Sequence, residues 1–245
     1  MHIPTSRPLA LWFFSLLLSA VACAAPTACE VTSGDRLTPV IELYTSEGCS
    51  SCPPADQWLS TLKGKPLVVQ AFHVAYWDYI GWKDRFASPA FTARQREIAL
   101  ANKLTGIYTP QVVRNGRDWS QWRYPLQSME PTARARASIH LLAGASPNAF
   151  EARVIPVTGS GAWTAYWTTT ENNHSSQVKA GENAGEYLKH DFVVRQYVAV
   201  GRYEGAQTLT YFSIPAQADH PRQINLVVSD ALTGEPLQAV SLSCS

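Results

Sequence analysis

Two cysteines three positions apart, Cys49 and Cys52, carry the clearest chemistry in the sequence. When such a pair is reduced, one thiolate can attack another disulfide and the second thiol can resolve the mixed disulfide that forms. This chemistry requires an exposed, ionisable attacking sulfur, which we assign to Cys49, and a resolving sulfur within bonding reach, which we assign to Cys52. A plain structural disulfide is the alternative. C-x-x-C pairs also occur in zinc sites, but the sequence has no second pair to complete a four-thiolate site.

The residues around the pair predict the elements that would position it. A β-rich run over 39–45 precedes the pair, and a helix-like stretch over 55–62 follows it. Two prolines come directly after Cys52, and proline cannot donate a backbone hydrogen bond. The helix is therefore predicted to begin only at Pro53, capped by Cys52 or by the serine before it. Cys49 would then lie outside the helix and gain less from its dipole, so we expect a mild redox role or none.

The rest of the first half alternates predicted strands with predicted helices. The apolar run over 66–74 is typical of a buried parallel strand. Ser88 and Pro89 predict a helix start, because serine caps well and proline suits the first helical position. A further helix is predicted over 129–143. This order of elements predicts an α/β domain over 37–144.

The second half has a different pattern, a series of short strands without a long helix. Alternating apolar and polar residues within these strands are typical of antiparallel sheets with one buried face. We therefore expect an antiparallel β-sandwich-like domain over 148–245. The predicted strands cover 150–157, 163–170, 192–200, 208–214, 224–228 and 237–242.

The segment IELYTSEGCSSC is similar to the first strand and active-site turn of thioredoxin-like proteins. In that fold a Thr-Pro or similar pair before the third strand holds a cis-proline beside the dithiol, and Thr109-Pro110 matches that place. Four longer segments resemble a bacterial family of secreted thioredoxin-like proteins of unknown function, DUF1223: TSEGCSSCPPAD, FHVAYWDYIGWKDRFASPAFTARQ, GIYTPQ and GENAGEYLKHDFVVR. The resemblance implies a thioredoxin-like fold for the N-terminal domain and supplies no substrate.

Several residues could border the dithiol in such a fold. Tyr108, Thr109 and Pro110 are expected to offer a backbone edge to an extended substrate peptide. Trp77 and Asp78 belong to an aromatic segment that could wall a substrate groove or simply cover the sheet.

Two residues of the predicted strands could act on the cysteines directly. Glu42, seven residues before Cys49, could move a proton at the inner thiol, or could be an ionised residue at a strand edge. His73 could join Cys49 and Cys52 as a copper or zinc ligand, as in thioredoxin-like copper chaperones, although those usually have a wider cysteine spacing.

A polar, glycine-containing stretch over 178–191 separates two strands of the second half. It is longer than the ~4–6 residues of most connections. We predict that it lies against the first half near the dithiol, Trp77 and Pro110 and narrows access to the sulfurs. Glu182 or His190 would then influence how readily the first thiol ionises. A mobile surface loop is the alternative.

The first residues predict export. Leu9–Val21 is mostly apolar and Ala22-Cys23-Ala24 follows, a small-x-small site typical of a secretory signal peptide over 1–24. The mature protein is therefore expected in the periplasm or outside the cell. Lipidation of Cys23 is the alternative.

Removing Cys23 leaves four cysteines, and an even number in an exported chain predicts two disulfides. Pairing Cys49 with Cys52 and Cys29 with Cys244 is the most economical arrangement, although two other pairings stay open. A bond between Cys29 and Cys244 would be structural and would join the two ends of the mature chain.

Composition narrows the remaining function classes. The 245 residues include 20 Lys and Arg against 19 Asp and Glu, so no basic excess favours nucleic acid. No later apolar run is long enough to span a membrane, and no phosphate-binding or hydrolase motif is present.

We expect an exported thiol–disulfide oxidoreductase that needs no cofactor and acts on a protein or a small thiol or disulfide. The alternative is a non-catalytic module that binds a metal such as copper, or a protein partner. The sequence predicts no oligomeric state.

Overall fold

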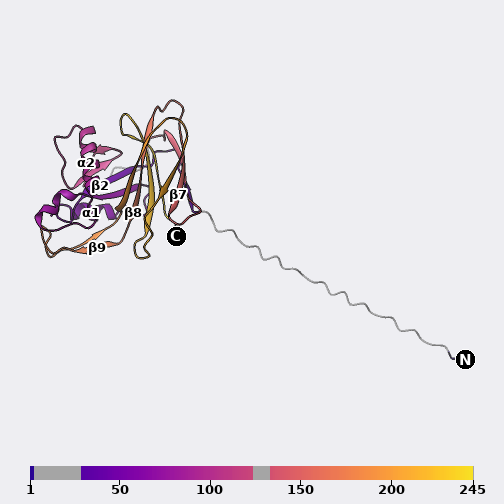
Figure 1. The fold of residues 1–245 in the computed structure, drawn as a ribbon, viewed down its shortest axis with the longest axis horizontal. Coiled ribbons are helices and arrows are strands. Elements are labelled where there is room, and N and C mark those ends of the chain that lie inside the picture. The colour runs from indigo at the N-terminus through magenta and orange to yellow at the C-terminus, as the bar shows by residue number, and fades with distance from the viewer. Residues whose placement is uncertain (3–28, 124–132, 245) are drawn as a thin grey trace.

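The computed structural model describes residues 1–2, 29–123 and 133–244, and within them the chain forms fourteen strands and three short helices (Figure 1). The helices are α1 (Pro53–Ser60), the 3-10 helix η1 (Ala75–Ile80) and α2 (Pro89–Ala101). The strands are β1 (Glu30–Thr32), β2 (Val40–Thr45), β3 (Val68–His73), β4 (Gln111–Arg114), β5 (Arg117–Asp118), β6 (Ala137–Ala143), β7 (Ala149–Pro156), β8 (Trp163–Glu171), β9 (His174–Gln177), β10 (Tyr187–His190), β11 (Val193–Tyr203), β12 (Gln207–Phe212), β13 (Arg222–Asp230) and β14 (Pro236–Leu242).

The strands form three sheets. The largest has eight strands in the order β14-β13-β8-β11-β3-β2-β4-β5, and a second has four in the order β1-β6-β7-β12. Strands β9 and β10 form a separate antiparallel pair. Within the large sheet β2 and β3 are parallel, and β11 joins β3 in parallel through Val193 and Ala71.

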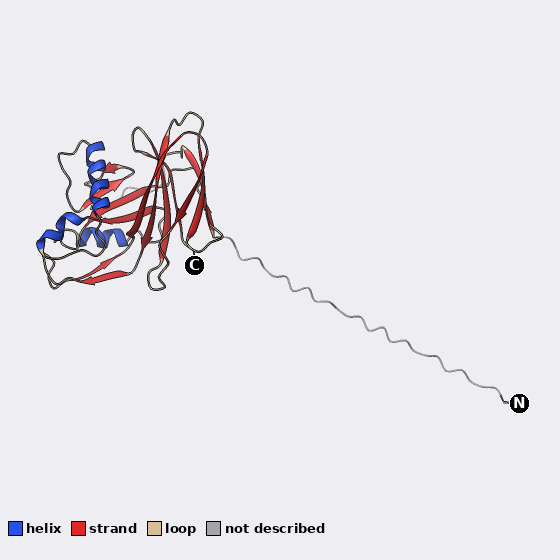
Figure 2. Cartoon of the chain, in the orientation of Figure 1, coloured by secondary structure: helices blue, strands red, loops and turns tan. Residues whose placement is uncertain are grey.

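Helices α1 and α2 cover opposite faces of the large sheet around β2, at one end of the molecule (Figure 2). Alternate residues of β2 point to opposite faces. Ile41 and Leu43 pack with Leu59 of α1, and Tyr44 packs with Phe91 of α2. Every residue of β2 is buried, so this strand lies between two apolar layers and fixes the turn that follows it.

The largest apolar core lies between the four-stranded sheet and strands β8, β13 and β14. Ile139 and Leu141 of β6 face Trp163 and Trp167 of β8 in this core. Trp167 stacks on Tyr211 with ring centroids 5.1 Å apart. The strands predicted for the second half are all present, and their pairs within this region are antiparallel.

The predicted helix over 129–143 is wrong where the structure describes it. Ala137–Ala143 is strand β6, paired with β1 and β7, and residues 129–132 lie outside the described part of the chain. Ala137, Ile139 and Leu141 are buried and the residues between them are more exposed. This period of two fits a strand with one buried face. The alternation is hard to see in the sequence, because alanine and leucine occupy both buried and more exposed positions.

The predicted α/β thioredoxin-like N-terminal domain is also wrong, because the chain is mostly β. The residues with assigned structure contain only three helices, and β2 to β5 do not form a sheet of their own. Strand β11 extends the same sheet through β8, β13 and β14. Local patterns predict strands but not their neighbours, since pairing between distant strands depends on tertiary packing. The division into domains over 37–144 and 148–245 stays a prediction.

Both predicted helix starts are confirmed. Helix α1 begins at Pro53 with Cys52 as its N-cap. Helix α2 begins at Pro89, and the Ser88 side chain accepts a hydrogen bond from the Ala90 backbone N–H. Proline occupies the first turn in both helices, where its missing N–H costs no hydrogen bond.

The predicted bond between Cys29 and Cys244 is confirmed, and it links residues 215 positions apart in the chain. It joins the segment before β1 to the segment after β14. The predicted signal peptide over 1–24 and the alternative lipidation at Cys23 concern residues almost wholly outside the described part of the chain. No helix within the described ranges has the length and apolar character needed to cross a membrane.

Candidate functional site

The predicted Cys49–Cys52 disulfide is present in the turn between β2 and α1. The Cys49 backbone N–H donates to the Ser46 carbonyl at 3.2 Å, and the Cys52 N–H donates to the Cys49 carbonyl at 3.1 Å. The Cys52 carbonyl then accepts from the N–H groups of Ala55 and Asp56. The cysteine turn is therefore continuous with the hydrogen bonds of α1, and Cys49 lies outside the helix as predicted.

The expectation of an exposed attacking sulfur is wrong for the state that the structure describes. Cys49 is 1% exposed and Cys52 is fully buried. A segment of the second half, Gly181–Gly185, covers part of the turn and hydrogen-bonds to Glu47, Cys49 and Ser50. Trp77 and Ile80 pack beside Gly48 at the same turn.

Two side chains of this segment hold the cysteine turn. The Asn183 amide donates to the carbonyls of Glu47 and Cys49 at 2.8 and 3.0 Å, and Asn183 is itself buried. The Glu182 carboxylate accepts from the Ser50 N–H at 3.0 Å and from its hydroxyl at 2.8 Å. These bonds lower the pKa of the exposed Glu182. The predicted contact between this stretch and the dithiol turn is confirmed.

Gly181 allows the segment to approach this closely. Its φ is +77°, a region that favours glycine, and a Cβ atom there would lie 2.9 Å from the Cδ1 of Ile80. Gly48 packs against the same helix, since a Cβ there would lie 3.1 Å from the Trp77 Cβ and 3.1 Å from the Ile80 Cδ1. Ile80 therefore contacts both segments.

We predict that Asn183→Ala speeds reduction of the Cys49–Cys52 disulfide. Removing the amide takes one donor from each of the Glu47 and Cys49 carbonyls, and the Cys49 carbonyl keeps only the Cys52 N–H. At about 0.5–1.5 kcal/mol for each bond, opening of the segment should become roughly 5–150-fold more frequent. The measurement is the rate of thiol release by dithiothreitol in the native protein. Glu182→Gln, which keeps a carbonyl acceptor at an exposed position, serves as the control and should change the rate less. Equal rates in wild type and Asn183→Ala would exclude a covering role.

The predicted cis peptide bond between Thr109 and Pro110 is confirmed. The Trp77 indole N–H donates to the Thr109 hydroxyl at 2.8 Å, which connects η1 to this loop. Tyr108 is 41% exposed, and its carbonyl accepts one hydrogen bond from the Gln95 amide at 2.7 Å. Burial and the neighbouring Asp118 raise the pKa of the Tyr108 hydroxyl. The role of this edge in substrate binding stays a prediction.

Glu42 lies in the middle of the large sheet and has its own partners. Its carboxylate pairs with Arg94 of α2 at 2.6 Å and accepts from the hydroxyls of Tyr44 and Tyr166 at 2.7 and 2.8 Å. Burial opposes the charge, but Arg94 and the two hydroxyls outweigh it and lower the pKa of Glu42. Among the described residues its hydrogen bonds lead to this cluster and not to the cysteines. The sequence interpretation missed Arg94. This residue lies in α2, 52 positions after Glu42, and no sequence motif links the two.

A second group of buried polar side chains lies at the ends of β2 and β3, beside the cysteine turn. His73 and Asp84 are 1% and 2% exposed, and the His73 Nδ1 lies 2.7 Å from an Asp84 oxygen. The same Asp84 oxygen accepts from the Glu47 N–H at 3.0 Å. Asp78 accepts from the Asp84 N–H, and burial raises the pKa of Asp78. His73 thus belongs to a carboxylate-rich cluster.

His190 of β10 completes this cluster. Its Nδ1 lies 3.7 Å from an Asp56 oxygen, and its Nε2 lies 3.3 Å from a Glu47 oxygen. Burial lowers the affinity of His190 for a proton, but the two carboxylates outweigh burial and raise its pKa to about 10. The rings of His73 and His190 meet edge to face with centroids 5.0 Å apart. The sequence interpretation named both histidines but missed three carboxylates, Glu47, Asp56 and Asp84.

Two solved structures are similar to this one. Protein AGR_C_4864 from Agrobacterium tumefaciens superposes with a TM-score of 0.61 at 25% identity, covering 86% of this chain and 96% of that chain. HBP35 of Porphyromonas gingivalis superposes with a TM-score of 0.55 at 14% identity, covering 85% of this chain and 75% of that one. At 14% identity the second likeness concerns the fold alone. No curated protein matches the chain.

A protein-family model matches residues 40–229, which include the cysteine turn, the cis-proline loop, the covering segment and the buried polar cluster. This match confirms the family resemblance seen in the sequence. The chain therefore belongs to the family described as a protein of unknown function, DUF1223.

Proposed function

We propose that the protein is an exported thiol–disulfide oxidoreductase that acts through Cys49 and Cys52. The observation that supports this function best is the position of the second disulfide. A four-residue turn at the end of a buried strand holds both sulfurs, and Cys52 is the N-cap of α1. A thiolate formed there lies at the positive end of the helix dipole, which stabilises Cys52 as a leaving group.

The reaction exchanges one disulfide for another. A substrate thiolate attacks the Cys49 sulfur, the Cys49–Cys52 bond breaks, and Cys52 leaves as a thiolate that takes up a proton. A second substrate thiolate then attacks the substrate sulfur of the mixed disulfide and releases Cys49. The substrate dithiol loses two electrons and two protons, and Cys49 and Cys52 gain them. The reverse sequence reduces a substrate disulfide.

Access to Cys49 requires movement of the segment Gly181–Gly185. Its contacts with Ser50 lie at an exposed position, where water can replace them, while those of Asn183 are buried. While the segment is in place, small thiols in solution have little access to Cys49. A protein partner that displaces the segment can reach it. A protein or peptide dithiol is therefore the preferred class of substrate.

The test is a redox titration of the mature protein in glutathione buffers, with each disulfide followed separately by peptide mapping. We expect Cys49–Cys52 to equilibrate at a potential above about −300 mV, and the Cys29–Cys244 bond, which serves as the internal control, to stay oxidised. Cys52→Ser should accumulate a mixed disulfide with glutathione at Cys49. A potential below about −300 mV for Cys49–Cys52, with no mixed disulfide, would mark a structural bond and contradict the proposal.

Export is part of the same proposal and rests on the sequence of residues 1–24. Cleavage after Ala24 is expected, so the intact mass of the protein recovered from the periplasm or medium should correspond to a chain that begins at Ala25. A lipidated Cys23 at the first position would instead identify a lipoprotein.

A further inference from the structure

Three side chains of the buried polar cluster point unsatisfied atoms toward one place. His73, His190 and Asp56 are 1%, 2% and 6% exposed, and one ligand atom from each lies within 4.8 Å of the others. The His73 Nε2 and both ring nitrogens of His190 have no hydrogen-bond partner. Buried polar atoms are almost always hydrogen-bonded, but the His73 Nε2 has no partner and the His190 nitrogens have only carboxylate contacts at 3.3 and 3.7 Å, so the cluster can accept a further ligand.

The opposite side of each of these residues is already held. The His73 Nδ1 bonds to Asp84 at 2.7 Å, which leaves the Nε2 to act as a ligand. The Thr45 hydroxyl donates to one Asp56 oxygen at 2.8 Å and leaves the other to face His190. This arrangement is typical of metal sites, in which outer carboxylates and hydroxyls fix the orientation of the ligands.

Glu47 orients His190 in a similar way. Its Nε2 lies 3.3 Å from a Glu47 oxygen that has no hydrogen-bond partner, so Glu47 can accept the Nε2 proton while Nδ1 serves as a ligand. The Nδ1 is 3.7 Å from Asp56, too far for a hydrogen bond. Ligand atoms around a tetrahedral zinc ion are about 3.3 Å apart, so a small shift of either side chain suffices.

The charge of the cluster also favours a cation. Asp56, Asp84 and Glu47 are three carboxylates, all at most 6% exposed. In the described part of the chain, their ion pairs are with His73 and His190 and none is with a lysine or arginine. A dication would supply the positive charge that no lysine or arginine brings to these three carboxylates.

We propose that Asp56, His73 and His190 bind one divalent transition-metal ion of the zinc class, with Asp84, Glu47 and Thr45 orienting them. Two imidazoles and one carboxylate suit zinc and its neighbours in the first transition row, and not magnesium or calcium. Three protein ligands leave a fourth position for water or another small ligand. This site shares only His73 with the Cys49–Cys52–His73 alternative and needs no reduction of the disulfide.

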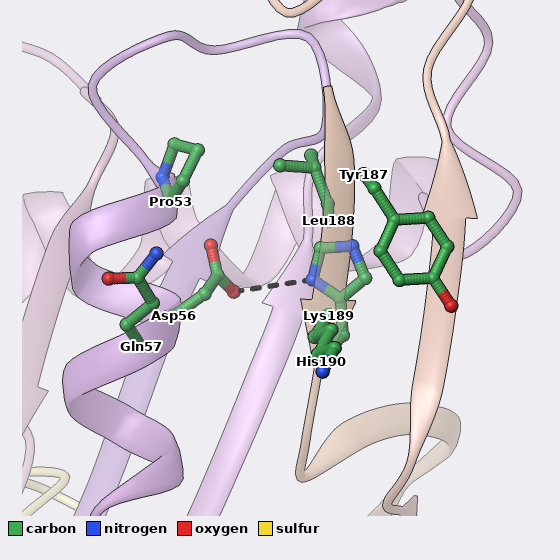
Figure 3. Close-up of a pocket in the computed structure, with 7 residues that line it drawn as sticks. All are labelled: Pro53, Asp56, Gln57, Tyr187, Leu188, Lys189 and His190. Carbon is green, nitrogen blue, oxygen red and sulfur yellow. Dashed lines mark ion pairs between the residues drawn. The ribbon is translucent and has the colours of Figure 1, made fainter. Parts of the chain in front are cut away.

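An entry path leads to two of the ligands. A pocket of about 150 Å³ between α1 and β10 is lined by Asp56 and His190, with Pro53, Gln57, Leu188 and Lys189 among its other walls (Figure 3). Figure 3 shows the Asp56 carboxylate and the His190 ring facing each other across it. An ion entering here would reach His190 and Asp56 first and His73 behind them.

The test is isothermal titration of Zn²⁺ into the full mature protein, stripped with a chelator and kept oxidised. We expect one ion per chain, no saturable binding of Mg²⁺, and loss of binding in His73→Ala and in the nearly isosteric Asp56→Asn. Asp84→Asn should weaken binding about 10–100-fold, as removal of an outer partner does elsewhere. Co²⁺ in place of Zn²⁺ should give the visible absorption of a four-coordinate site, and His73→Ala should abolish it.

Two further variants keep the test decisive. Cys49→Ser/Cys52→Ser should bind Zn²⁺ as the wild type does, and a requirement for reduced cysteines would overturn the proposal. His140→Gln, which alters a histidine of β6 that pairs with Glu30 at 2.9 Å in the four-stranded sheet, should also bind normally. Loss of binding in His140→Gln alone, or absence of stoichiometric binding in the wild type, would contradict the assignment. Circular dichroism confirms that each variant is folded.

Discussion

Arg94→Met is expected to lower the free energy of unfolding by about 3–5 kcal/mol, because it leaves a buried carboxylate without its cation. The Arg94 guanidinium lies 2.6 Å from Glu42, inside a cluster closed by Tyr44 and Tyr166. It also stacks over the Tyr166 ring at 4.1 Å, so the variant loses packing as well as charge. The measurement is urea denaturation at pH 7, followed by tryptophan fluorescence.

The matched control is the double variant Glu42→Gln/Arg94→Met. It removes both charges while the glutamine carbonyl still accepts from the tyrosines, so it should recover much of the loss. A double variant as unstable as Arg94→Met would show that packing, and not the unpaired charge, causes the effect.

The dependence on pH gives a second check. In the wild type the pKa of Glu42 is lowered, so the stabilisation by the ion pair is present above the ordinary glutamate pKa of about 4.3 and is lost as pH falls through the lowered value. In Arg94→Met burial acts without the cation and should raise the pKa of Glu42. As pH falls, Glu42 of the variant should therefore become neutral at a higher pH than in the wild type, which removes the cost of the buried charge. The difference in stability between the two proteins should therefore shrink between pH 7 and pH 4.

The double variant Cys29→Ser/Cys244→Ser should lose up to about 5 kcal/mol of stability. In the chain-entropy model the stabilisation grows with the length of the closed loop, and this bond links residues 215 positions apart. Both ends of the described core should fray first, because β1 and β14 flank the bond. Denaturation by guanidinium measures the loss, and hydrogen exchange in β1 locates it.

The second disulfide serves as the comparison. Cys49 and Cys52 close a turn of only four residues, and the same model assigns that bond about 2 kcal/mol. Cys49→Ser/Cys52→Ser should therefore cost clearly less. Equal losses in the two double variants would show that loop length does not determine the stabilisation in this protein.

Short-range features of the fold could be predicted from the sequence because their causes are local. The prolines after Cys52 fix the start of α1, and Ser88-Pro89 fixes the start of α2. Alternating residues identify the strands of the second half. The identity of Ala137–Ala143 could not be read in the same way, because alanine and leucine suit a helix as well as a strand and only the apolar layer behind Ile139 and Leu141 decides between them.

The candidate site shows the same division. Cys49, Cys52 and the cis-proline follow from a motif, and His73 and His190 stand out as histidines in apolar or β-rich surroundings. Their partners could not be predicted, because Asp84 and Glu47 come close only when β3, the cysteine turn and β10 meet. Only Asp56 could have been noticed in the sequence. It is an acidic residue in the first turn of the predicted helix, four positions after Cys52, and so must lie near the cysteine turn.

The strand order of the large sheet has a consequence for synthesis of the chain. Strand β3 pairs with β11, and Val193 lies 120 residues after His73. At the usual pace of a ribosome that interval lasts roughly 6–24 s, during which one edge of β3 has no neighbour. Unpaired edges of this kind recruit other chains and start aggregates. The order of strands therefore favours a nascent chain that is kept unfolded until translation is nearly complete.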